Sequence, residues 1–158
     1  EIAYMKEGKV KIIDQKIGEI KNLPLEDIGF NKSLLAMLYW AEGSKGSGPV
    51  EFVNTDPDLM VLYITLLRKC YNIDEDKFRV RLRVHYYHQI KKLRIFWSKL
   101  LDVPVGQFGK IFIKKRSLIK KFRKNPAGIC SLRYNDSRVR KELLKLGLTL
   151  QGLIVKNK

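Results

Sequence analysis

A buried helix is predicted by residues 31–43, NKSLLAMLYWAEG. Asn31 or Ser33 can cap its start, and residues 34–41 are apolar on every side of the helix that they would form. A helix that is apolar all round must be covered all round. In a chain of 158 residues, this predicts a helix that packs against its own sheet and also against a second subunit. Gly43 is expected to end the helix.

The clearest strand prediction lies at residues 78–87, FRVRLRVHYY. One alternate set of side chains is apolar or aromatic: Phe78, Val80, Leu82, Val84 and Tyr86. The other set is mainly basic: Arg79, Arg81, Arg83, His85 and Tyr87. Because successive side chains of a strand point to opposite faces, the first set should line a core. The second set should then cover the opposite face of the sheet with guanidinium groups.

The remaining pattern predicts an α+β domain with helices packed on one face of a sheet. Further strands are expected at residues 50–55, 108–114 and 129–134, and a helix at 90–100. Asp56-Pro57 should start another helix, and Asp136 a last one that Gly147 closes. The domain is expected to cover residues 31–150. Residues 1–30 are interpreted as an N-terminal arm or linker, and residues 151–158 as a tail.

The composition points to a polyanionic partner. The chain carries 32 Lys and Arg against 16 Asp and Glu, a formal charge of +16. So large an excess of one sign repels itself in the compact state, and nucleic acid is the usual partner that neutralises it. An anionic membrane surface is the alternative, but a basic amphipathic helix usually binds it rather than a basic sheet. Many ribosomal proteins are equally basic, so that class stays open.

The sequence also predicts an intracellular, cytoplasmic protein. No apolar run approaches the roughly 20 residues that a membrane-spanning helix needs, so no membrane partner is expected. Residues 1–11 are mixed and charged, unlike the apolar segment of a signal peptide. Cys70 and Cys130 fit neither a disulfide framework nor a zinc motif. Their apolar neighbours predict buried, reduced thiols.

The predicted helix ends in a segment that resembles the signature of a known family. Residues 35–43, LAMLYWAEG, are similar to the nonapeptide motif of the LAGLIDADG homing endonucleases. Glu42 stands where the family has an acidic residue, while Met37 replaces a small residue and Trp40 the first aspartate. The likeness covers roughly residues 33–146 and looks like a subgroup of single-motif members. The positions that match the motif letter for letter are Leu35, Ala36, Leu38, Ala41 and Gly43.

This resemblance implies a specific fold and activity. The family's motif helices pair at the centre of two αβ halves, and their saddle-shaped antiparallel sheets lie in the DNA major groove. The acidic residue at the end of each motif helix binds a divalent metal, usually Mg²⁺, and the pair of sites cleaves both strands. A chain with one motif is therefore expected to act as a homodimer on double-stranded DNA with a roughly palindromic site.

The resemblance and the charges together assign roles to particular residues. Glu42, with the adjacent Gly43, is expected at the metal, since Mg²⁺ takes oxygen ligands. A carboxylate at the negative end of a helix also needs a cation, which the metal or Lys45 would supply. Lys110 and Lys114 are candidate catalytic charges beside the cleaved phosphate. The expected dimer interface is formed by Ser33, Leu34, Met37, Leu38 and Ala41.

Most of the expected DNA contacts lie in the second half of the chain. Between Val103 and Asn135 there is no acidic residue, whereas nine are basic. Arginines on a sheet can read guanine bidentately in a major groove, while a basic loop more commonly contacts phosphates. The predicted DNA-binding residues are Lys45, Arg79, Arg81, Arg83, His85, Lys110, Lys114, Lys115, Arg116, Lys120, Lys121, Arg123, Lys124 and Arg133.

Other functions fit the same pattern. A DNA-binding transcriptional regulator that keeps the fold without cleaving would show the same residues, and so would an RNA-binding or intron-splicing protein. Glu42 can also be a simple helix-terminal carboxylate, and the arginine row a solvated sheet face. His85 and His88 have no nearby Cys or Asp partners, so a histidine metal site is not expected.

Overall fold

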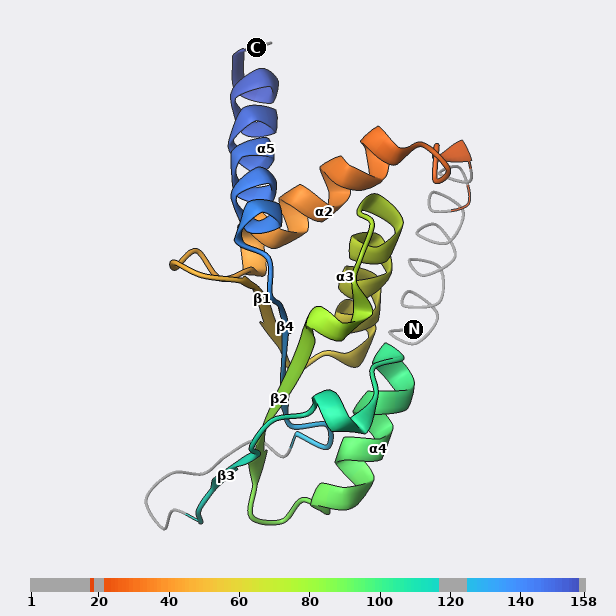
Figure 1. Cartoon of the computed structure of the whole chain (residues 1–158). Helices are drawn as coiled ribbons and strands as arrows, with labels where there is room; N and C mark the ends of the chain where they lie inside the picture. The colour runs from red at the N-terminus through yellow and green to blue at the C-terminus, as the bar shows by residue number, and fades with distance from the viewer. Residues whose placement is uncertain (1–17, 19–21, 117–124, 157–158) are drawn as a thin grey trace, which may run out of the picture.

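A four-stranded sheet with helices against one side organises the chain, which makes it a mixed α+β structure as predicted (Figure 1). The computed structural model describes residues 18, 22–116 and 125–156. Figure 1 shows α3 and α4 on the same side of the sheet, while α2 and α5 cross at one end of it. The elements in chain order are α2 (Ile28–Glu42), β1 (Val50–Asn54), α3 (Pro57–Cys70), β2 (Phe78–His85), α4 (Ile90–Leu101), β3 (Phe112–Lys114), β4 (Ile129–Tyr134) and α5 (Ser137–Lys156).

The strand order across the sheet is β1-β4-β2-β3. β4 pairs antiparallel with both β1 and β2, so that Tyr134 lies opposite Val50 on one side and Phe78 on the other. β3 instead runs parallel to β2, with Phe112 beside Arg83. The prediction of a wholly antiparallel sheet is therefore wrong. The chain leaves β2, forms α4 and then returns as β3, and a helical crossover of this kind joins parallel strands.

The predicted strand at 108–114 is shorter than expected. A 3-10 turn at Val105–Gln107 leads to Phe108, which makes an isolated parallel bridge with Val80. The backbone N–H of Gly109 donates to the carbonyl of Val80 at 2.9 Å. Regular pairing begins only at Phe112. The chain thus touches β2, moves away from it and rejoins it further along.

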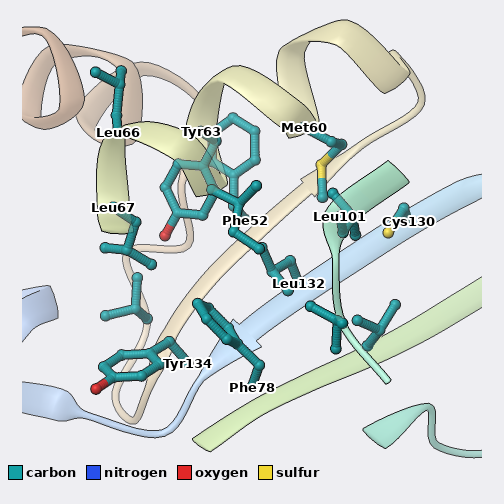
Figure 2. Close-up of a cluster of buried hydrophobic side chains, with 14 of the residues drawn as sticks. Phe52, Met60, Tyr63, Leu66, Leu67, Phe78, Leu101, Cys130, Leu132 and Tyr134 are labelled. Carbon is teal, nitrogen blue, oxygen red and sulfur yellow. The ribbon is translucent and has the colours of Figure 1, made fainter. Parts of the chain in front are cut away.

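The core lies between the inner face of the sheet and the helices (Figure 2). Phe52 of β1 stacks on Tyr63 of α3, with ring centroids 4.2 Å apart. The alternation predicted for β2 is confirmed, because all four of its inward-facing apolar side chains are buried. Tyr86 was expected with them but is exposed, since β2 ends at His85. Cys70 and Cys130 are buried free thiols, as predicted.

Helix α2 begins earlier than the sequence suggested. Asp27, rather than Asn31 or Ser33, caps it by accepting a hydrogen bond from the backbone N–H of Phe30 at 2.6 Å. The buried Asn31 side chain donates to the carbonyls of Leu25 at 2.7 Å and Asp27 at 2.8 Å. The end of the predicted N-terminal arm is therefore fastened to the domain. Residues 1–17 and 19–21 of that arm lie outside the described residues.

Helix α5 is longer than predicted. Asp136 starts it as expected, because its carboxylate accepts hydrogen bonds from the backbone N–H groups of Arg138 and Val139. Gly147 does not end the helix, which continues to Lys156, so the predicted tail is helical as far as it is described. Gly147 instead faces α2, where an added Cβ would lie 3.0 Å from Trp40. The missing side chain lets the two helices approach closely.

Replacing Gly147 with valine is expected to destabilise the fold. The new side chain would press against Trp40, and overpacking of this kind costs about 1–3 kcal/mol. Gly152→Val is the matched control, because nothing lies within 4 Å of a Cβ built at that glycine of the same helix. Urea unfolding should show a lower free energy of unfolding for Gly147→Val alone. Equal losses in both variants would show that the α2–α5 contact does not require a glycine.

Candidate nucleic-acid interface

The outer face of the sheet carries the arginines that the alternation of residues 78–87 predicted. Arg79, Arg81 and Arg83 are all exposed on β2. Strand pairing aligns neighbouring side chains on the same face. It therefore places these arginines in three rows across the sheet: Glu51–Arg133–Arg79, Val53–Ser131–Arg81 and Ile129–Arg83–Phe112. His85 and Lys114 pair beyond the third row.

The first row is largely occupied by contacts within the protein. Glu51 accepts hydrogen bonds from Ser131 Oγ at 2.7 Å and from an Arg133 Nη atom at 3.4 Å. Arg79 donates to the backbone carbonyls of Asp76 and Phe78, both at 2.6 Å. Arg79 and Arg133, both predicted to contact DNA, are thus partly committed to holding this end of the sheet.

On this face, the guanidinium groups of Arg81 and Arg83 are available to a ligand. Within the part of the chain that the structure describes, neither guanidinium forms an ion pair or a side-chain hydrogen bond. Both side chains are exposed. Two unneutralised guanidiniums on one strand, two residues apart, form a strongly positive surface that favours an anionic ligand.

Two hollows lie beside these arginines: one where the chain separates from β2 between Gly109 and Phe112, and one beside the paired segments of β2 and β3. Arg83 and Phe112 line both of them. The first has a volume of about 520 Å³ and is also lined by Arg81, Leu82, Gly109, Lys110 and Ile111. The second has a volume of about 610 Å³ and is also lined by Val84, His85, Ile113, Lys114, Lys115 and Ile129.

His85 adds a neutral ring to the end of this surface. Desolvation lowers its pKa, and the positive charge of Lys114 and the nearby His88 lower it further. The ring stacks on Tyr87 with centroids 5.3 Å apart. His88 accepts a hydrogen bond from the His85 backbone N–H at its Nδ1 and donates from Nε2 to the Asn125 carbonyl at 2.6 Å. The two histidines therefore shape the turn that follows β2.

Glu42 lies at the exposed C-terminal end of α2. Gly43 caps the helix by donating its N–H to the Tyr39 carbonyl at 2.7 Å, and its backbone then bridges to Phe52 of β1. A side chain at position 43 would come closer than 3.0 Å to Tyr39, so this position requires glycine. Among the described residues, the Glu42 carboxylate has no ion-pair or hydrogen-bond partner, and Lys45 does not pair with it.

The loop that follows Glu42 is held in place by α5. The Nε of Arg140 donates to the carbonyl of Gly48 at 2.8 Å, and its Nη1 donates to that of Gly46. Tyr39 Oη donates to the carbonyl of Ser44 at 2.7 Å. Burial raises the pKa of Tyr39, so the phenol remains a protonated donor. Sequence reasoning missed Arg140, because a single arginine on a polar helix face forms no pattern.

Lys110 and Lys114 are not brought to Glu42 within the chain. Glu42 adjoins β1 through the Gly43–Phe52 bridge, whereas Lys114 ends β3. β1 and β3 are the two opposite edges of the sheet. Three strand spacings of about 4.8 Å separate such edges by roughly 14 Å. The two predicted catalytic lysines therefore belong to the arginine-lined hollows and not to the carboxylate.

Glu42 is the predicted ligand of a divalent metal at this position. Among the described residues, no group of three or more His, Cys, Asp or Glu is placed to hold a metal ion. Gly43 is buried and its N–H is used by the helix cap. Mg²⁺ accepts one or two carboxylates when water and phosphate oxygens complete its shell. Glu42 fits such an ion if a second chain and the nucleic acid provide further oxygens.

The side of α2 that was predicted to form a dimer interface is largely exposed in the described part of the chain. Leu34 and Met37 are 42% and 36% exposed, and Ala41 is exposed as well. Ser33 and Leu38, also predicted there, are half-buried. The opposite side of the helix is fully buried. Within the described residues, one side of the helix is covered, and Leu34, Met37 and Ala41 form an exposed strip on the other. Cover of this strip by a second subunit stays a prediction.

The other predicted DNA contacts that the structure describes are exposed but lie on different parts of the molecule. Lys115 and Arg116 are exposed just after β3, and Lys45 and Lys110 are exposed as well. Phe112 was missed as part of the outer face of the sheet, because the expected strand at 108–114 did not show which residues would pair with β2. The remaining predicted contacts lie outside the described residues: Lys120, Lys121, Arg123 and Lys124.

Comparisons with known proteins provide no relative. The chain matches no protein-family model, no curated protein and no solved structure at a significant level. The likeness to the LAGLIDADG family therefore rests on the residues quoted above. Along the segments that the structure describes, none of the helices combines the length and apolar character needed to cross a membrane.

Proposed function

We propose that this protein binds duplex DNA through the outer face of its sheet and cleaves it with a divalent metal held at Glu42 of two paired chains. The observation that carries the proposal is the pair Arg81 and Arg83. Both lack ion-pair partners among the described residues, and both open onto hollows lined by further basic residues. A basic surface of this kind is where a protein with a formal charge of +16 would bind a polyanion.

The spacing of the arginines suits a DNA major groove. Residues on the same face of a strand are about 6.8 Å apart, which equals two base-pair steps of about 3.4 Å. A major groove admits β-strands, and an arginine can donate two hydrogen bonds to the N7 and O6 atoms of guanine. Arg81 and Arg83 would then read bases two steps apart.

The lysines along the edge of the sheet are assigned to the DNA backbone. Lys110 lines the first hollow, and Lys114 and Lys115 line the second. Phosphate contacts of this kind fix the position of the protein on the duplex without reading its sequence.

Cleavage is assigned to Glu42 and depends on a dimer. The exposed strip of Leu34, Met37 and Ala41 would pair two α2 helices and place a Glu42 carboxylate on each side of the contact. A divalent cation supplies an activated water and neutralises charge at the phosphate when it is bound. Glu42 contributes an anchoring oxygen, and the loop that Arg140 holds fixes the backbone beside it.

A DNA-binding regulator that does not cleave is the second candidate. Met37 is the observation that favours it, because this large side chain lies in the exposed strip where the family has a small residue. Bulky side chains hold helices farther apart, and the two Glu42 carboxylates would then be separated. In that case the sheet would bind DNA and the carboxylates would not act together.

Binding to randomised duplex DNA at a series of salt concentrations tests the proposal. A plot of log affinity against log salt is expected to have a slope of about −4 or steeper, since each neutralised phosphate contributes about −0.9. Fluorescence anisotropy with a labelled duplex measures this, and structured RNA of the same length is the competitor. A flat salt response, or displacement by RNA before unlabelled duplex, would overturn the proposal.

A further inference from the structure

Phe112 is the most exposed large apolar side chain among the described residues, at 65%. Its neighbours Phe108 and Ile111 pack against the core, whereas Phe112 does not. The ring lies on the outer face beside Arg83 and lines both basic hollows. No contact within the described chain accounts for an aromatic ring at the centre of a positive surface.

The third row of the sheet differs from the other two in its chemistry. Arg83 is flanked by Ile129 on β4 and by Phe112 on β3. The first row has the Glu51 carboxylate beside Arg133, and the second has the Ser131 hydroxyl beside Arg81. Among the described rows, only the third places apolar groups on both sides of an unpaired guanidinium.

An apolar group on a DNA-reading surface has one natural partner in the major groove. The C5-methyl group of thymine is the apolar feature of the base edges there, and Phe is among the side chains that contact it. Phe112 on β3 pairs with Arg83 on β2, and neighbouring strands lie about 4.8 Å apart, across the direction of the strands. A ring on β3 would therefore meet a base edge of an adjoining base pair, beside the base that Arg83 contacts on β2.

We infer that Phe112 is a specificity-determining residue that contacts a thymine methyl group beside the base read by Arg83. The inference rests on the proposed binding of duplex DNA and deepens it by naming part of the recognised sequence, a guanine next to a thymine. Stacking on an unpaired base is the competing role for an exposed ring. Stacking surfaces use successive aromatic rings along a strand. Among the described residues, the rings of His85 and Tyr87 beyond the third row are stacked on each other, so Phe112 is the ring that lies beside Arg83.

Exchange of thymine for uracil tests this contact, because it removes only the methyl group. A duplex site is first enriched from a randomised pool with the wild-type protein, and its thymines are then replaced by uracil one at a time. Wild-type affinity is expected to fall about fourfold at a thymine next to a guanine, the equivalent of losing one buried methyl-sized group. Phe112→Ser is expected to bind the thymine and uracil duplexes equally, while Phe112→Leu keeps part of the difference.

Ile95→Ser is the matched control. Ile95 is an exposed apolar residue on α4, which lies on the other side of the sheet, and it lines neither of the two hollows. This variant should keep the full uracil penalty. Unfolding midpoints equal to that of the wild type would show that the exposed Phe112 can be replaced without damage to the fold.

The outcomes separate this inference from the proposed function. If no duplex is enriched, duplex binding itself is wrong, and the inference fails with it. If a duplex is enriched but no thymine shows a uracil penalty, or Phe112→Ser keeps the penalty, only the contact assigned to Phe112 is wrong. If wild-type protein prefers unpaired DNA and Phe112→Ser loses that preference, the ring stacks on bases and the thymine contact is rejected.

Discussion

Arg81→Glu combined with Arg83→Glu is expected to abolish sequence-specific binding of duplex DNA. Each bidentate arginine–guanine pair discriminates by roughly 1–3 kcal/mol, so the loss of two such pairs lowers affinity for the enriched site by about a thousandfold. Both side chains are exposed and unpaired among the described residues, so the fold should survive the change. Anisotropy titration of the enriched duplex measures the effect.

The matched control for the arginines is Lys91→Glu with Lys92→Glu. These exposed lysines lie on α4, which packs against the opposite side of the sheet, and their exchange alters the net charge by the same amount. They should weaken binding only slightly at moderate salt, since distant charges are screened. Equal losses in the two double variants would mean that net charge drives binding and that the outer face of the sheet has no special role.

Glu42→Gln is expected to eliminate Mg²⁺-dependent cleavage while leaving DNA affinity nearly unchanged. The amide keeps the shape of the side chain but removes the negative charge that attracts a hard cation. Loss of one charge-stabilising group commonly lowers a rate by roughly a hundred- to a thousandfold. Conversion of a supercoiled plasmid that carries the enriched site, measured over time, reports the cleavage rate.

Glu142→Gln serves as the control for this carboxylate. Glu142 is an exposed acid on α5 that pairs with Lys32 at 3.0 Å, away from the end of α2. Its replacement should leave the cleavage rate unaltered. Continued cutting by Glu42→Gln would remove Glu42 from the site. Tight binding by the wild-type protein without cutting, in Mg²⁺ or Mn²⁺, would favour the regulator over the endonuclease.

The parts of the fold that could be predicted are those in which one face of an element meets the core. Apolar and basic side chains alternate without a break along residues 78–85. Once the apolar side chains are assigned to the core, the basic ones must lie on the opposite face of the sheet. β4 also occupies the predicted residues, although three of its consecutive residues are buried. The direction of β3 could not be predicted in this way, because it depends on the path of the chain through α4 and not on local periodicity.

Local sequence preferences for the residues that start and end helices were misleading at two positions. Gly43 ends α2 as predicted, but Gly147 lies inside α5 because Trp40 of another helix occupies the space of its side chain. Asn31 has the chemistry of a helix cap and is instead buried, with its amide bonded to the preceding backbone. Such roles depend on neighbours that are distant in sequence.

The candidate site likewise contains residues that local periodicity predicted and residues whose roles depend on distant contacts. The arginines of β2 were predicted because they repeat with the period of a strand. The contribution of Phe112 depends on its pairing with Arg83, and that of Arg140 on its reach across to Gly46 and Gly48. The separation of Lys110 and Lys114 from Glu42 follows from the strand order, which no spacing in the sequence reveals.

Helix α5 contacts the chain both before and after Glu42, which restricts the backbone that carries this carboxylate. Arg140 fastens the segment after Glu42, and Gly147 seats the same helix against α2 before it. If Glu42 binds a divalent cation, as proposed, the carboxylate is presented from a preorganised backbone, and less conformational freedom is lost when the cation binds. Substitutions in α5 would then tune ligand affinity from a distance, without touching the ligand at all.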